Sequence, residues 1–132
     1  MKRDMDLVRE ILLAIEEKHT GEAIFNLQIP EHNSNEIAFH CRLLYDAGLI
    51  SQYKEKWADN RISIFAVGGL TWEGYDYLDK VRDNSVWKKT KDVIKEKGLP
   101  LIFDTIKTIA SALITATAEG VANSIIKNGG HI

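Results

Sequence analysis

The sequence has a single cysteine, Cys41, and only two prolines. One cysteine excludes a disulfide within the chain and a zinc site built from several cysteines. The first residues, MKRDMDLVREI, are charged and amphipathic, so they lack the apolar stretch of a signal peptide. These absences predict a cytoplasmic protein.

The chain also lacks an excess of charge of either sign. Its formal net charge is −2 and its pI is near 6.1. Binding to nucleic acid or to an acidic membrane would therefore need a local patch. At 132 residues, with 45% hydrophobic and 27% charged residues, the chain has the composition of a soluble globular protein.

Motifs of catalysis are missing as well. The sequence contains no phosphate-binding glycine loop, no nucleophile elbow and no HExxH motif. His19, His32 and His131 have no spacing typical of metal ligands. We therefore expect no enzyme activity, no cofactor and no metal site.

Hydrophobic periodicity predicts a mainly α-helical fold with a small antiparallel β hairpin. Thr71 is expected to cap the third helix and Asp83 to follow its end. Gly74 marks a place where another backbone comes close. Helices are predicted over 4–18, 34–47, 71–82, 86–97 and 100–126, and strands over 22–28, 50–56 and 61–67.

The predicted helix 34–47 has one apolar face and one polar face. Phe39 and Leu43 fall on the broad apolar face, whereas Asn35, Ala38 and Arg42 recur on the other. Asn pairs with adenine, Arg with guanine, and Ala permits close approach to a base. The polar face is therefore a candidate for reading DNA, although an ordinary solvent-exposed surface has the same pattern.

Basic residues gather in two places. The hairpin carries Lys54, Lys56 and Arg61 against Glu55 and Asp59. Such point charges can contact phosphates without regard to base sequence. Residues 86–97 contain five lysines, including Lys88 and Lys89, against two acidic residues, which is also common on simple soluble surfaces.

Four larger side chains require assignment. Trp57 lies beside the polar hairpin turn, so we expect it to be exposed and to contact a partner or a base. Trp72 and Trp87 lie beside apolar stripes and are expected to be buried. His40 falls within the apolar face of helix 34–47, which predicts a hydrogen-bonded core histidine.

The segment 98–132 has few charged residues. Its apolar residues surround much of the predicted helix, which indicates self-association into a homo-oligomer. Asp104, Lys107 and Glu119 limit its uncharged window to 11 residues, against about 20 needed to cross a bilayer, so we expect no membrane contact. The proposed oligomerisation stripe is Ile102, Ile106, Ile109, Leu113 and Ala116.

The order of helix, short strand, helix ending in LLYDAGLI, hairpin and LTWEGYDYL resembles a winged helix-turn-helix domain. MKRDMDLVREIL, FHCRLLYDAGLI and LTWEGYDYLDKVRDNSVWKKTK together resemble the domain-of-unknown-function 2513 family. The resemblance covers about residues 1–97 and implies a winged-helix-like domain there. The C-terminal helix predicted from the apolar pattern lies in the remaining segment, 98–132. It also implies a bacterial phage or prophage setting, and no established activity.

One segment departs from the superfamily pattern. EAIFNLQIPEHNS is predicted as strand and loop, where a standard helix-turn-helix has a helix that crosses the DNA backbone. Two functions remain open. The first is a nucleic-acid-binding regulator that contacts double-stranded DNA. The alternative is a protein-interaction module on the same scaffold, which binds a host protein and no DNA.

Overall fold

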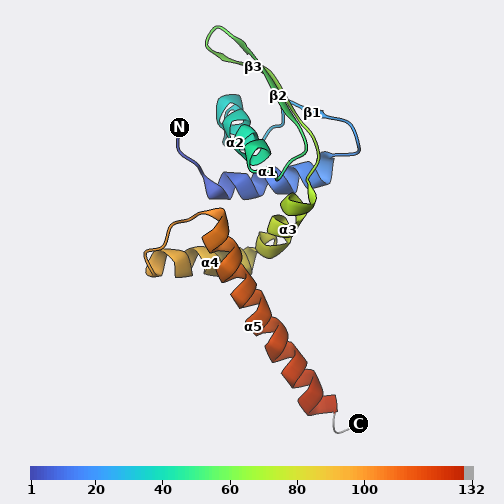
Figure 1. Cartoon of the computed structure of the whole chain (residues 1–132), viewed down its shortest axis with the longest axis vertical. Coiled ribbons are helices and arrows are strands. Elements are labelled where there is room, and N and C mark those ends of the chain that lie inside the picture. The colour runs from blue at the N-terminus through green and yellow to red at the C-terminus, as the bar shows by residue number, and fades with distance from the viewer. Residues whose placement is uncertain (130–132) are drawn as a thin grey trace. The chain divides into compact units, whose positions relative to one another are not determined.

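The computed structural model describes residues 1–129. Over these residues it is mainly helical, with a small three-stranded antiparallel sheet (Figure 1). This confirms the predicted fold class at that level. The elements are α1 Met5–Lys18, β1 Ile24–Phe25, α2 Ser34–Asp46, β2 Tyr53–Ala58, β3 Arg61–Val67, α3 Trp72–Val81, α4 Asn84–Glu96 and α5 Phe103–Gly129.

β1 is much shorter than the predicted strand 22–28. It ends at Phe25 because Asn26 adopts a left-handed backbone conformation, with φ of 50°. The Asn26 side chain then accepts a hydrogen bond from the backbone N–H of Phe65, at 3.0 Å. The chain leaves the sheet at this point and continues to α2 as a loop.

The strands are ordered β1-β3-β2, so the two-residue β1 and the longer β2 lie on either side of β3. Ile24 and Tyr53 both pair with Val67. Asp59 and Asn60 form the hairpin turn with φ of 52° and 63°, as a tight two-residue turn requires. The register shifts between Lys56 and Trp57, which marks a β-bulge near the tip.

His40 connects α2 to the beginning of α1. Its Nε2 accepts a hydrogen bond from the backbone N–H of Asp4 at 2.8 Å, and its Nδ1 lies 2.7 Å from the carbonyl oxygen of Glu36. These partners fit a neutral ring protonated at Nδ1. His40 is 2% exposed, so the prediction of a hydrogen-bonded core histidine is confirmed.

Hydrogen bonds connect the residues that follow α2 to the start of α3. The Thr71 hydroxyl donates to the Gly48 carbonyl at 2.6 Å, and the Thr71 N–H donates to the Leu49 carbonyl at 3.0 Å. The Gly74 N–H in turn donates to Thr71 Oγ1, which confirms the predicted cap. A Cβ atom at Gly74 would collide with the Leu49 carbonyl oxygen, as expected for a close approach.

The chain divides into two compact units, Met1–Asp79 and a second that begins at Lys80. The boundary therefore falls within α3, earlier than the predicted domain boundary at 97/98. In the second unit α4 packs against α5. Trp87 on α4 is buried as predicted, but Trp72 is 83% exposed, so the prediction of its burial was wrong.

Trp72 is the first residue of α3, and its side chain lies on the solvent side of that turn. The inward positions of α3 are instead filled by Gly74, Tyr77, Leu78 and Val81. An apolar residue beside an apolar stripe is therefore not sufficient evidence for burial.

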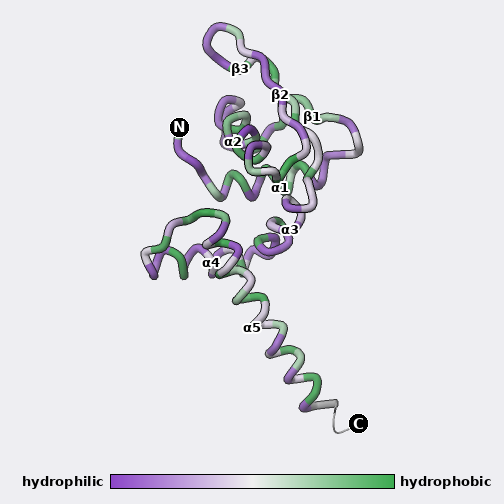
Figure 2. Tube along the Cα trace, viewed as in Figure 1, coloured by the Kyte–Doolittle hydropathy of each residue, from purple (hydrophilic) through white to green (hydrophobic). Residues whose placement is uncertain are grey.

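α5 changes character along its length. Ile106 and Ala110 are fully buried in its first part, whereas Val121, Ile125 and Ile126 are more than half exposed. Figure 2 shows hydrophobic residues recurring along the whole helix. By length and composition alone, Phe103–Lys127 is long and apolar enough to cross a membrane, which is weak evidence for a membrane span.

Candidate nucleic-acid interface

The free face of α2 differs from the predicted one. Ala38 is only 1% exposed, so it cannot contact a base, and its prediction as a contact residue was wrong. α2 packs against α1 and against both hairpin strands, so its covered face extends further round the helix than the apolar residues alone indicate. Phe39 and Leu43, predicted on the apolar face, are half-buried.

Asn35 connects α2 to the hairpin. Its Oδ1 accepts a hydrogen bond from the backbone N–H of Ile62 at 3.1 Å. Asn35 and Arg61 line the same cleft at the N-terminal end of α2, which has a volume of about 460 Å³. The structure thus brings these two predicted contact residues together. The side-chain oxygen of Asn35, however, is already occupied by the hydrogen bond from Ile62.

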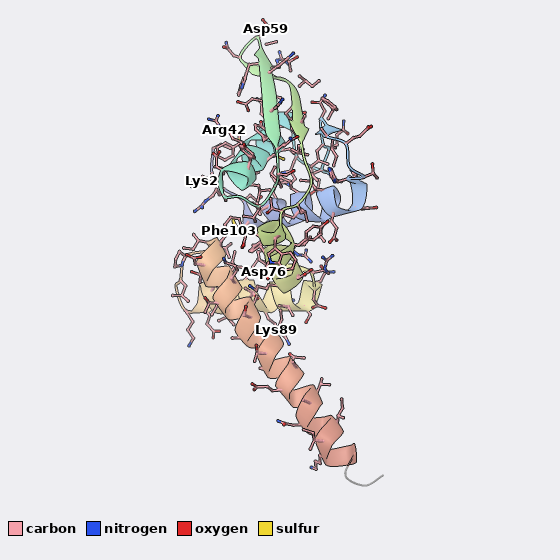
Figure 3. The ribbon with its side chains drawn as sticks, turned by 45° about the vertical axis from the view of Figure 1, so that its right-hand side comes forward. Lys2, Arg42, Asp59, Asp76, Lys89 and Phe103 are labelled. Carbon is pink, nitrogen blue, oxygen red and sulfur yellow. The ribbon has the colours of Figure 1, made fainter. Side chains whose placement is uncertain are left out.

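Arg42 lies on the solvent side of α2, beside the hairpin (Figure 3). Its guanidinium is 3.7 Å from the carboxylate of Glu55 on β2. The Glu55 carboxylate also accepts a hydrogen bond from the Tyr53 hydroxyl at 2.6 Å. That bond, a further one from the Trp57 indole and the Arg42 charge lower the pKa of Glu55. Arg42 therefore has an acidic partner that stays ionised.

Trp57 is 57% exposed, which confirms the predicted exposure. Its hydrogen bond to Glu55 places it on the same face of the hairpin as Arg42's partner. Tyr45 on α2 is also 46% exposed. This α2–hairpin face, formed by Phe39, Arg42, Tyr45, Glu55 and Trp57, combines aromatic rings with a neutralised ion pair.

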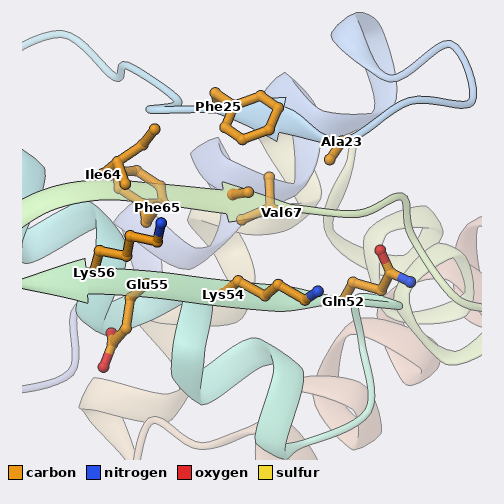
Figure 4. Close-up of a pocket in the computed structure, with 10 residues that line it drawn as sticks. Ala23, Phe25, Gln52, Lys54, Glu55, Lys56, Ile64, Phe65 and Val67 are labelled. Atoms are coloured by element: carbon orange, nitrogen blue, oxygen red, sulfur yellow. The ribbon is translucent and has the colours of Figure 1, made fainter.

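Lys54 and Lys56 lie on the opposite face of the hairpin, because successive strand residues alternate between faces. Together with Phe25 and Ile64 they line an open groove of about 520 Å³ (Figure 4). Both lysines and Arg61 are exposed, and none of the residues that the structure describes forms an ion pair with them. The hairpin therefore presents three exposed cations without ion-pair partners among the described residues, with Lys54 and Lys56 in the groove and Arg61 in the cleft at the N-terminal end of α2.

Sequence reasoning did not identify Phe25 as a candidate functional residue, because it lies within the predicted strand 22–28. The structure has Phe25 64% exposed and Leu27 buried. The left-handed Asn26 between them reverses the alternation, and an asparagine within a short apolar strand is the only signal that could have indicated this.

Lys88 and Lys89 are exposed on α4, in the second unit. Neighbouring Lys91 lies over the Trp87 ring, with its Nζ 5.3 Å from the ring centroid. Phosphate contact by Lys88 and Lys89 stays a prediction.

Only part of the proposed oligomerisation stripe is exposed, so only that part can contact a second copy of the chain. Ile106 is fully buried within its own chain, which corrects its assignment to an intermolecular contact. The first part of α5 must cover α4, and Ile106 lies in that part. Ile102, Ile109 and Leu113 are half-buried and Ala116 is exposed.

Groups with catalytic potential are few. Burial raises the pKa of Cys41 to about 12, so its thiol is unreactive near neutral pH. Among residues 1–129, no group of three or more His, Cys, Asp or Glu side chains could hold a metal ion.

Comparison with known proteins gives two matches. Residues 2–100 match the family described as "Hypothetical protein (DUF2513)". An uncharacterized protein from Haemophilus influenzae is 39% identical over 119 residues, which cover 87% of this chain and 97% of that protein. No solved structure matches the chain.

Proposed function

The chain belongs to the DUF2513 family, and we propose that in this member the first unit is a winged-helix variant that binds double-stranded DNA through phosphate contacts. The sheet order β1-β3-β2, with α2 directly before the hairpin, supports the winged-helix assignment. DNA binding is a common use of that scaffold, which is an argument by analogy. A cytoplasmic location and a phage or prophage regulator role remain part of this proposal.

One observation carries the proposal: Lys54, Lys56 and Arg61 are exposed cations without ion-pair partners in the described chain. Phosphate contact needs such free charges. Arg61 also shares a cleft with the N-terminal turn of α2, where helix geometry favours an anion. Arg42 is paired with Glu55 and Ala38 is buried, so we propose that α2 positions the hairpin and does not read bases.

A salt titration with random duplex DNA tests this. Each phosphate contact contributes about −0.9 to the slope of log K against log salt, so three cations predict a slope of about −2.7. Lys54→Gln, Lys56→Gln and Arg61→Gln should each reduce the slope by about one unit. Lys18→Gln removes an exposed charge from the end of α1 and serves as the matched control. A flat response to salt, or equal effects of all four substitutions, would contradict the proposal.

Arg42→Ala separates phosphate contact from base reading. We expect it to leave the preference among duplex sequences unchanged. A loss of about 1–3 kcal/mol that is confined to particular sequences would show instead that Arg42 leaves Glu55 and reads a base.

Protein binding is the second candidate, and the α2–hairpin face favours it. Aromatic residues and arginine are enriched at protein interfaces, and here the charge of Arg42 is already balanced. We propose a host protein as the partner. A photo-crosslinker in place of Trp57 should capture one protein that binds purified wild-type chain and fails to bind the Trp57→Ala variant. Equal capture by a crosslinker at position 18 would refute this candidate.

A further inference from the structure

We propose that the groove on the outer face of the sheet binds unpaired nucleotides of a single-stranded nucleic acid, with a base stacked on Phe25. This inference rests on the proposed function only in taking nucleic acid as the ligand. The groove shares no lining residue with the cleft that contains Arg61.

The groove combines an apolar floor with two lysines, and Glu55 between them in β2 is also among its lining residues (Figure 4). Phe25, Ile64 and Ala66 come from β1 and β3, and Lys54 and Lys56 come from β2 (Figure 4). Phe25 is 64% exposed, although a large aromatic ring is costly to leave in water without a partner. The volume of about 520 Å³ accommodates a nucleobase together with part of its backbone.

The spacing of the cations fits a repeating anion. Lys54 and Lys56 are two residues apart on one strand, which places their Cα atoms about 6.6 Å from each other along the groove. Gln52, at one end of the groove, adds an amide that can both donate and accept hydrogen bonds. Lysines that follow the backbone beside an aromatic platform are the usual elements of single-strand binding sites.

The exposed ring distinguishes single strands from duplexes. In a duplex the base faces are already stacked on one another, so they cannot cover Phe25. An unpaired base can do so, and every base has a suitable face, so we expect little sequence preference. Duplex DNA can still use the phosphate contacts of Lys54 and Lys56.

Fluorescence anisotropy with labelled oligothymidine of about 12 nucleotides, and with a duplex of the same length, tests the inference. Phe25→Leu should weaken oligothymidine binding about 5- to 100-fold and leave duplex binding unchanged. Phe25→Trp should retain single-strand binding because it keeps an aromatic face. Arg61→Gln should weaken duplex binding and spare oligothymidine. Circular dichroism confirms that each variant is folded.

An abasic oligomer of the same length separates stacking from charge. It should bind the wild type about as weakly as oligothymidine binds Phe25→Leu. The inference is overturned if Phe25→Leu binds oligothymidine as tightly as the wild type, or if the abasic oligomer binds equally well. Binding of oligothymidine without duplex would refute the proposed function alone, and binding of duplex without oligothymidine would refute this inference alone.

Discussion

His32 precedes α2 and lies beside two carboxylates. Its Nδ1 is 3.0 Å from Glu36 Oε2, and its Nε2 is 3.9 Å from Glu10 Oε2. The hydrogen bond to Glu36 raises the pKa of His32 above 6.5 and lowers the pKa of Glu36 below 4.5. The pair therefore stabilises the fold most between these two values. Its contribution is lost as pH rises through the raised pKa of His32 or falls through the lowered pKa of Glu36.

Titration of the His32 ring by NMR checks this assignment. In Glu36→Gln the pKa of His32 should fall back toward its ordinary value, because the carboxylate that holds the proton is gone. Glu10→Gln is the control and should have a smaller effect, since Glu10 is more distant. Equal effects of the two substitutions would contradict the assignment.

His40 is expected to matter for stability and not for binding. His40→Ala should reduce the free energy of unfolding by about 1–3 kcal/mol, because it leaves a cavity and an unpaired Asp4 N–H. Tyr45→Ala, at an exposed position of the same helix, should change it by less than about 0.5 kcal/mol. Urea denaturation measures both. A His40→Ala chain of unchanged stability that has lost binding would show a ligand role.

At the scale of elements, the contact between α3 and the end of α2 makes a sharp prediction. Alanine is about 1 kcal/mol more favourable than glycine within a helix, so Gly74→Ala would stabilise a free helix. Here the new methyl group meets the Leu49 carbonyl oxygen. We therefore expect Gly74→Ala to destabilise the protein by about 1–3 kcal/mol in thermal or urea denaturation.

Gly120 on α5 provides the matched control. A Cβ atom there meets nothing within 4 Å, so Gly120→Ala should show the ordinary helix preference and leave the protein as stable or more stable. If both substitutions stabilise the protein, α3 does not approach Leu49 as closely as the structure indicates.

Local signals predicted most of these elements. Thr71 and Asp83 have short-range roles at helix ends, so the sequence around each was enough to identify it. The end of β1 was missed because it depends on Asn26 and its bond to Phe65, a residue far along the chain. The alternation of apolar and polar residues in 22–28 does not indicate at which residue the strand stops pairing with its neighbour.

The candidate site was harder to predict for the same reason. Periodicity finds which residues of a helix are apolar, but alanine is small enough to lie on either face. Only the position of the hairpin decides that Ala38 is covered while Phe39 remains half-exposed. The Arg42–Glu55 ion pair likewise joins two elements, α2 and β2. The two charges are visible in the sequence, but nothing in the sequence indicates that they lie side by side.

At the scale of the whole molecule, the second half of α5 carries several exposed apolar side chains, among them Val121, Ile125 and Ile126. The helix has 27 residues and is therefore about 40 Å long. Ile114, Val121 and Ile125 are exposed at spacings of seven and four residues, which forms one stripe. Such surfaces commonly mark association, and we propose that the stripe pairs with a second copy of this chain.

Light scattering of the full chain and of a chain that ends after Ala112 tests this. The shorter chain keeps Ile106 and Ala110, which are buried, and we expect it to be folded and monomeric. Ile125→Glu should dissociate the full-length assembly. A full-length chain that stays monomeric at high micromolar concentration, or one that co-sediments with lipid vesicles only when residues 113–129 are present, would refute self-association.

The base of the hairpin is closed independently of its tip. Ile50 bridges to Leu70, Ser51 bonds to Gly69, and Thr71 bonds to Leu49. Adding or removing two residue pairs beside the Asp59–Asn60 turn preserves both the hydrogen-bond pattern at the turn and the side-chain alternation below it. Hairpin length can therefore vary between relatives, or be exchanged by grafting, without rebuilding the helices. The distance that the hairpin tip extends toward a partner can thus change by two residue pairs at a time, while the helices that carry the hairpin stay the same.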